Sequence, residues 1–267
     1  MIAMKIDIYN TKAEKTGTVE IKNLAPVRPD LIKKAVLALQ SSQRQPYGAA
    51  PEAGMRHSSE ISRRRRKYRG SYGKGISRVP RKIHTRRGLQ FFWVGATMPG
   101  TVGGRRAHPP KADKIWAKAI NAKERRKAIT SAIAATFDRD LVTNRGHLLP
   151  EAYPFALSAD VETISKTKDA LALLTTLGFG EEIERKAERV IRAGKGKMRA
   201  RKYQGGTSLL IVVSENCPLK DALGNVRGID VARIDELNAE LLAPGTHPGR
   251  ATIFTDKALE RYYEVSA

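Results

Sequence analysis

Residues 209–213 read Leu-Leu-Ile-Val-Val, five apolar side chains in succession. Neighbouring side chains of a strand point to opposite faces, so an unbroken apolar run indicates a strand that is covered on both sides. Strands of this kind are typical of parallel sheets with helices packed on each face. This stretch therefore predicts an α/β fold.

The segments around this strand alternate between strand and helix patterns. Short apolar or β-branched runs predict further strands at 155–157, 226–231 and 252–254. Apolar residues at helical spacing predict helices near 171–177 and at 181–192, 233–242 and 256–263. Such alternation favours a mostly parallel sheet that is covered by helices.

The first 43 residues predict a strand, a turn, a second strand and a helix. Apolar and polar residues alternate around Ile6 and around Val19, with a turn near Gly17. Pro29 suits the first position of a helix, and the apolar pattern that follows ends near Gln43. A second, longer helix is expected at 112–142, and its first half is rich in lysine and arginine. That basic face is either an ordinary solvated surface or part of a binding surface.

Positive charge is concentrated in one part of the chain. The chain carries 49 Lys and Arg against 27 Asp and Glu, a formal net charge of +22. Residues 44–111 hold 17 of the cations and two acids, Glu52 and Glu60, and so about two thirds of the excess charge. An excess of this size implies a polyanionic partner, because neutralising phosphates releases condensed counterions.

The same segment has the composition of an RNA-binding extension. It contains ten Gly and six Pro and keeps no apolar period beyond a few residues, which predicts little regular structure. A flexible, solvated loop is one interpretation. However, aromatic residues accompany the cations, among them Tyr68, Tyr72 and the Phe91-Phe92-Trp93 triplet. Aromatic and arginine planes stack on unpaired bases, so we expect the segment to become ordered on RNA. As a hairpin it would reach about 110 Å if fully extended.

A second basic cluster lies at 192–202, where six cations, two glycines and no acid occur. It is either a solvated loop or a second phosphate contact, and we favour the contact. Anionic membrane would also attract this chain. The longest uncharged run, 88–104, contains Pro99 and several glycines, so it predicts no membrane helix, and the first residues predict no signal peptide. The single Cys217 excludes an internal disulfide and favours a reduced, cytoplasmic setting.

No catalytic or metal-binding pattern is evident, so we predict no enzyme, no cofactor and no metal site. The phosphate loop of nucleotide-binding proteins is absent, and Gly178-Phe179-Gly180 begins a dinucleotide pattern whose third glycine is replaced by Ile183. The five histidines lie far apart without metal-ligand spacing. Glu181 and Glu182 are expected to be helix N-terminal charges that favour the macrodipole.

Several stretches carry a family resemblance that spans essentially the whole chain. They are Tyr-Arg-Gly-Ser-Tyr-Gly-Lys-Gly-Ile-Ser-Arg-Val-Pro-Arg at 68–81, Gly-Gly-Arg-Arg-Ala-His-Pro-Pro-Lys at 103–111, residues 121–136, Ala-Gly-Lys-Gly-Lys-Met-Arg-Ala-Arg-Lys-Tyr at 193–203 and Pro-Gly-Arg-Ala-Thr-Ile-Phe-Thr at 248–255. On these residues the chain resembles the universal large-subunit ribosomal protein family L-four, in its archaeal and eukaryotic form.

The resemblance implies a Rossmann-like globular domain, formed here by residues 1–43 and 112–267. It also implies a long basic loop at 44–111 that threads through rRNA and supports subunit assembly. The implied partners are large-subunit rRNA, neighbouring large-subunit ribosomal proteins and the nascent peptide. The loop tip is expected at 67–75 and would line part of the peptide exit tunnel through Lys67, Arg69, Gly70, Ser71, Tyr72, Gly73, Lys74 and Gly75.

The predicted rRNA-binding residues combine this resemblance with the charge pattern. They are Arg44, Arg56, Arg63, Arg64, Arg65, Arg66, Lys67, Tyr68, Arg69, Tyr72, Lys74, Arg78, Arg81, Lys82, Arg86, Arg87, Arg105, Arg106, His108, Lys111, Lys195, Lys197, Arg199, Arg201 and Lys202. The main alternative is an RNA-modifying enzyme whose α/β domain binds a nucleotide cofactor. A glycine loop after a strand would favour that alternative. A membrane-surface protein would instead require an apolar face within the basic segment.

Overall fold

The computed structural model describes residues 2–67 and 70–266, with the backbone alone at 2–3, 22–23, 83–86, 91–92 and 264–266. By its internal contacts the chain divides into two units. The sheet unit consists of Met1–Gln43 and Ala117–Ala267, and the basic unit is Arg44–Trp116.

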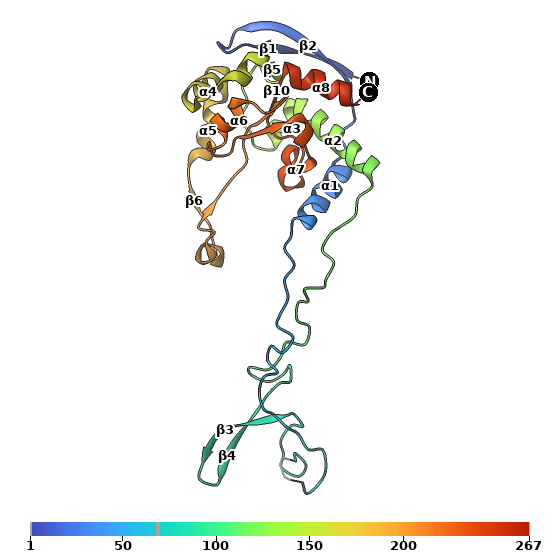
Figure 1. The fold of residues 1–267 in the computed structure, drawn as a ribbon, viewed down its shortest axis with the longest axis vertical. Helices are drawn as coiled ribbons and strands as arrows, with labels where there is room; N and C mark the ends of the chain where they lie inside the picture. The colour runs from blue at the N-terminus through green and yellow to red at the C-terminus, as the bar shows by residue number, and fades with distance from the viewer. Residues whose placement is uncertain (1, 68–69, 267) are drawn as a thin grey trace. The chain divides into compact units, whose positions relative to one another are not determined.

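The sheet unit is built on a mixed six-stranded sheet with the strand order β2-β1-β5-β10-β8-β9 (Figure 1). β1 and β2 pair antiparallel, and the remaining four neighbouring pairs are parallel. The strands are β1 (Ile2–Tyr9), β2 (Lys15–Leu24), β5 (Phe155–Leu157), β8 (Leu210–Val213), β9 (Asp230–Arg233) and β10 (Thr252–Thr255). The α/β prediction is confirmed, with β2 as an antiparallel edge strand.

Apolar side chains of the central strands divide between two cores, one on each face of the sheet. On β8, Leu210 and Val212 belong to one core, whereas Ile211 and Val213 belong to the other. The first core is covered by α1 (Pro29–Ser42), α2 (Ala122–Phe137), α7 (Ala239–Leu242) and α8 (Asp256–Ser266). The second is covered by α3 (Arg139–Asn144), α4 (Thr167–Leu174), α5 (Gly180–Ala187) and α6 (Pro218–Leu223). All four residues of β8 are buried, as the apolar run predicts.

The predicted helix at 112–142 is wrong at both ends. Residues 112–121 are not helical, and one reason is that Lys118 donates its backbone N–H to the side chain of Ser41. α2 ends at Phe137 because the Asp138 carboxylate accepts hydrogen bonds from the backbone N–H groups of Asp140 and Leu141 and so caps a new helix, α3.

Three other elements differ from the sequence-based expectation. The helix expected at 181–192 stops at Ala187, because β6 (Val190–Ile191) pairs with β7 (Tyr203–Gln204). The strand expected at 226–231 is shifted to β9, where pairing with β8 fixes the register. Residues 233–242 form a 3₁₀ turn and the short α7 instead of one helix, because Asn238 caps α7.

The basic unit contains regular structure that the sequence pattern did not indicate. β3 (Arg81–Arg87) and β4 (Gln90–Gly95) form an antiparallel hairpin, and Gly88 at its turn has φ +60°. Glu60 and Arg81 exchange two backbone hydrogen bonds of 3.3 and 3.2 Å. The prediction of little regular structure is therefore wrong at 81–95. Across the part of the chain that the structure describes, no helix is long and apolar enough to cross a membrane.

Candidate nucleic-acid interface

The most concentrated positive charge of the basic unit is the run from Arg63 to Lys67. All five side chains are exposed, and none lies within 4 Å of a carboxylate among the described residues. By contrast, Arg56 lies 3.7 Å from Glu52. A run of exposed guanidinium groups that lack protein partners is suited to bind several phosphates at once.

The predicted loop tip follows this run. Cations in the tip and just after it lie over aromatic rings: the Arg78 guanidinium is 5.0 Å from the Tyr72 ring centre, and the Lys74 amine is 5.5 Å from the Trp93 ring centre. Gly73 and Gly75 have φ values of +75° and +65°, which favour glycine at both positions. The tip thus combines cations with aromatic surface, as single-stranded RNA sites do.

Arg81 differs from the other predicted contact residues because its own loop uses its side chain. The guanidinium donates to the Ser77 carbonyl at 2.7 Å, to the Val79 carbonyl at 3.3 Å and to the Ser77 hydroxyl at 3.2 Å. This arrangement holds the turn that leads into β3. Arg81 therefore shapes the loop as well as contributing charge.

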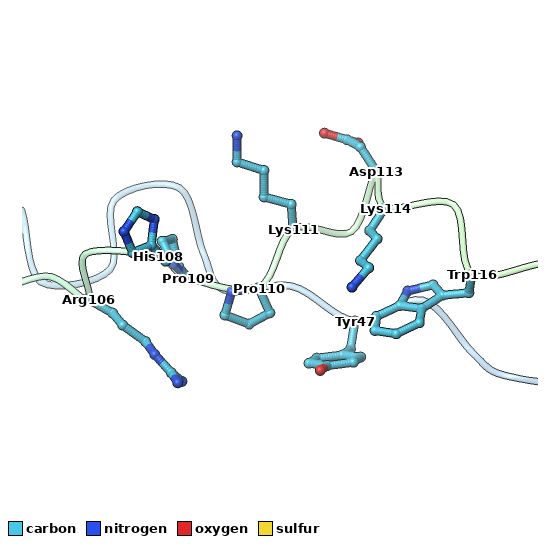
Figure 2. Close-up of a pocket in the computed structure, with 9 residues that line it drawn as sticks. All are labelled: Tyr47, Arg106, His108, Pro109, Pro110, Lys111, Asp113, Lys114 and Trp116. Atoms are coloured by element: carbon cyan, nitrogen blue, oxygen red, sulfur yellow. The ribbon is translucent and has the colours of Figure 1, made fainter.

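A second feature of the basic unit is an open hollow of about 590 Å³ beside Trp116 (Figure 2). Tyr47 and Trp116 stack there with ring centres 5.4 Å apart and planes inclined by 23°. The Arg44 guanidinium lies 4.1 Å, and the Lys114 amine 4.4 Å, from the Trp116 ring centre. Tyr47 remains 53% exposed. Further lining residues are Arg106, His108, Pro109, Pro110, Lys111 and Asp113.

The two chain segments beside this hollow approach each other closely. The Ala49 N–H donates to the Pro110 carbonyl at 3.0 Å. A Cβ atom on Gly48 would lie 2.7 Å from the backbone nitrogen of Ala112, so only glycine fits at that position. The hollow is therefore shaped by main-chain contacts.

The sheet unit has its own basic surface, the hairpin formed by β6, β7 and the 3₁₀ turn Lys195–Arg199 between them. Figure 1 shows this segment projecting from the sheet near α5. Arg192 closes the hairpin, since its guanidinium donates to the carbonyls of Arg201 and Tyr203 at 3.2 and 3.5 Å. The cations of the turn are exposed, as is Met198 at 82%.

Buried ionic groups hold the base of this hairpin on the sheet unit. Glu182 is fully buried and accepts hydrogen bonds from Ser208 at 2.7 Å, from the Leu148 N–H at 3.0 Å and from Arg185 at 2.5 and 2.8 Å. His147 lies 2.7 Å away on the same carboxylate. Burial by itself would raise the pKa of Glu182, but these hydrogen bonds hold it far below its usual value.

Two arginines of the sheet unit are structural. Arg250, 1% exposed, donates to the backbone carbonyls of Ser208 and Leu241 at 2.8 and 3.0 Å and pairs with Asp230. Burial lowers its pKa. Burial, together with the nearby charge of Arg250, lowers the pKa of Arg145 to about 10. These side chains are used within the fold and do not add to the binding surface.

The carboxyl ends of β8 and β10 border a hollow of about 920 Å³, the place where many α/β enzymes bind a ligand. Here Glu162 accepts hydrogen bonds from the Ser214 N–H and hydroxyl at 2.9 and 2.8 Å and from Thr255 at 2.7 Å. Its carboxylate joins the strand ends. Within the described ranges, no three His, Cys, Asp or Glu side chains are grouped as metal ligands.

The predicted contact residues are mostly exposed, and they lie in two places, the basic unit and the hairpin. Arg81, Lys82 and Arg105 are partly buried, and Gly70 and Ser71 are buried. Tyr68 and Arg69 lie outside the described residues, as does the side chain of Arg86. The sequence reasoning missed Tyr47, Lys114 and Trp116. A tryptophan among lysines, just after a Pro-Pro pair, was the available signal.

The sequence is similar to a known family along nearly its whole length. It matches the ribosomal protein L4/L1 family over residues 22–265. It is 47% identical over 264 residues to the large ribosomal subunit protein uL4 of Nanoarchaeum equitans, covering 98% of each chain. It is 42% identical over 260 residues to the uL4 protein of Archaeoglobus fulgidus, covering 96% of this chain and 97% of the relative. It is 46% identical over 266 residues to the uL4 protein of Methanoculleus marisnigri, covering 98% of this chain and 100% of the relative.

Proposed function

Because the chain belongs to the ribosomal protein L4/L1 family, we propose that it binds large-subunit rRNA through the basic unit and the β6–β7 hairpin. Membership in this family makes it a structural, non-enzymatic protein of the large subunit of the cytoplasmic ribosome. The RNA-modifying alternative is therefore set aside. The observation that carries the rRNA proposal is the exposed run Arg63–Arg66 with Lys67, whose charges lack protein partners among the described residues.

The two surfaces have different roles in this proposal. Residues 44–111 form the extended rRNA-binding loop, which supports subunit assembly, and the hairpin cations Lys195, Lys197, Arg199, Arg201 and Lys202 form a separate phosphate contact. The sheet unit, for which we propose a Rossmann-like fold, supports the hairpin. Four parallel strand pairings and helices on both faces of the sheet support that classification.

We also propose that the tip at 67–75 lines part of the peptide exit tunnel and meets the nascent peptide. Support comes from the family and from the tip's composition: exposed Tyr72 and Lys74 and two glycines with positive φ. Such a surface offers cationic and aromatic groups to a passing peptide, and neighbouring ribosomal proteins would contact the rest of the chain.

rRNA binding is tested by crosslinking the protein in cells and sequencing the attached RNA. The proposal expects large-subunit rRNA, and recovery of scattered mRNA or tRNA without it would overturn the proposal. Tunnel lining needs a separate experiment. A Lys74→Cys variant in a Cys217→Ser background should crosslink to a stalled nascent chain in assembled ribosomes, whereas Lys166→Cys on the sheet unit should not. Equal crosslinking from both positions would contradict tunnel lining.

A further inference from the structure

We propose that the hollow beside Trp116 in the basic unit holds one unpaired nucleotide of RNA. The base stacks on Tyr47, and the phosphate lies beside Lys114, with Arg106 and Lys111 adding positive charge to the same hollow. This inference rests on the proposed function and gives it a defined subsite. The hollow, at about 590 Å³, falls within the size range of small-ligand sites, roughly 300–1,000 Å³.

The first support is an aromatic surface that its own neighbours leave partly uncovered. Trp116 is contacted by Tyr47, Arg44 and Lys114 and is partly buried. Tyr47, stacked on it, is 53% exposed. Aromatic rings stack on any base, because every base has a π face. Tyr47 is thus positioned by Trp116 and remains available to a base.

The second support is charge. Three cations, Arg106, Lys111 and Lys114, line the hollow together with a single carboxylate, Asp113, and a fourth cation, Arg44, lies over the Trp116 ring. Within the portion of the basic unit that the structure describes, none of these four cations forms an ion pair. A nucleotide brings the negative phosphate that such a set attracts, whereas an uncharged apolar ligand would leave the cations unused.

The third support is an unsatisfied donor. Nε1 of Trp116 is shielded from solvent and has no hydrogen-bond acceptor among the described residues. Buried N–H groups usually have a partner, so an orphan donor points to an acceptor supplied from elsewhere. Phosphate and base oxygens are acceptors of that kind, and Lys114 beside the ring favours an anionic one.

The fourth support is that backbone contacts shape the site. The Ala49–Pro110 hydrogen bond and the close approach of Gly48 to Ala112 join the two segments that carry Tyr47 and Lys111. A site held in this way loses little conformational entropy on binding. These backbone contacts distinguish the hollow from the exposed Arg63–Arg66 run.

The test uses the full-length protein with Trp93→Phe, so that Trp116 is the only tryptophan. Two oligomers of equal charge are compared by anisotropy: octaadenylate and an abasic octamer. We expect octaadenylate to bind at least about fivefold more tightly than the abasic octamer, which is the lower end of what stacking one base contributes. Its binding should also quench the fluorescence of Trp116. Equal affinity for the two oligomers would overturn the inference and leave general RNA binding intact. Binding of neither would overturn the proposed function itself.

Variants locate the effect. Tyr47→Ala should lose the preference for octaadenylate, and Tyr47→Phe should restore it, because only the ring is needed. Arg63→Ala, outside the hollow, should lower the affinity for both oligomers by the same factor. Near-UV circular dichroism identifies a Tyr47→Ala protein that has lost its fold. In that case Trp116→Leu, which removes the ring on which Tyr47 stacks, provides the test and should reduce the preference. The proposal would be contradicted if the preference for octaadenylate survived both variants. It would also be contradicted if AMP, at the same molar concentration, displaced bound octaadenylate as well as unlabelled octaadenylate does.

Discussion

The hydroxyl oxygen of Ser41, at the end of α1, accepts a 3.0 Å hydrogen bond from the backbone N–H of Lys118, 77 residues further along the chain. Ser41 is buried and also donates to the Ala38 carbonyl at 2.7 Å. The chain leaves the sheet unit just after Ser41 and has re-entered it just before Lys118. The exit and the entry therefore lie side by side.

This adjacency predicts that the basic unit can be removed without unfolding the sheet unit. Replacing residues 44–116 by a six-residue Gly-Ser linker should leave the free energy of unfolding unchanged or raise it by up to about 2 kcal/mol, because a shorter loop costs less entropy to close. Urea unfolding followed by circular dichroism measures this. Ser41→Ala in the linked protein should cost about 1–3 kcal/mol by leaving the Lys118 N–H without an acceptor. A linked protein without a cooperative transition would contradict the division into units.

Glu182 is expected to be essential for stability. Glu182→Ala removes the acceptor of four groups and leaves Arg185 and His147 without their carboxylate, so we expect a loss of about 3–5 kcal/mol. Glu184→Ala, on the exposed side of the same helix, is the matched control and should change stability by no more than about 0.5 kcal/mol. Similar urea midpoints for both variants would show that the buried network contributes little.

The same carboxylate predicts a pH dependence. Its pKa is lowered in the folded protein, so its contribution is fully present above the ordinary value of 4.5 and is lost as the pH falls below it. Wild-type stability should decrease from pH 6 to pH 3.5 more steeply than that of Glu182→Gln, which cannot titrate. Thermal unfolding at several pH values measures the two slopes. Parallel slopes would assign the acid sensitivity to other carboxylates.

The exposed arginine run predicts the salt dependence of RNA binding. Changing Arg63, Arg64, Arg65 and Arg66 to alanine should reduce the slope of log affinity against log salt by up to about 3–4, roughly one for each phosphate that is no longer neutralised. Titrations with large-subunit rRNA between 50 and 200 mM salt provide the measurement. The control removes the same charge from exposed positions of the sheet unit, Lys12, Lys33, Lys166 and Lys168. Equal effects of the two quadruple variants would mean that only total charge matters.

The elements that sequence predicted correctly are those that depend on local pattern. β8 is recognisable because five apolar residues in succession, two of them β-branched valines, are typical of a strand that is buried on both faces. α1 is recognisable from Pro29 and its apolar spacing. In contrast, the non-helical stretch before α2 includes Lys118, whose backbone N–H bonds to Ser41, and no local pattern contains that contact.

The candidate site divides in the same way. The exposure of the arginine run is predictable from sequence, because several adjacent guanidinium groups without nearby acids cannot be buried and must lie on the surface. The Tyr47–Trp116 stack joins residues far apart in the sequence, so composition alone could not pair them. Glu182 was expected to be a helix N-terminal charge, and it does lie in the first turn of α5. Its burial among four hydrogen-bonding groups depends on the tertiary fold.

β10 lies between β5 and β8 in the sheet, yet it is the last strand of the chain. During synthesis, β5 and β8 are made first and cannot occupy their final places until Thr252–Thr255 has emerged. The polycationic segment at 44–116 is complete long before that moment. A newly made chain therefore spends most of its synthesis with this polycationic segment finished and its hydrophobic core still open.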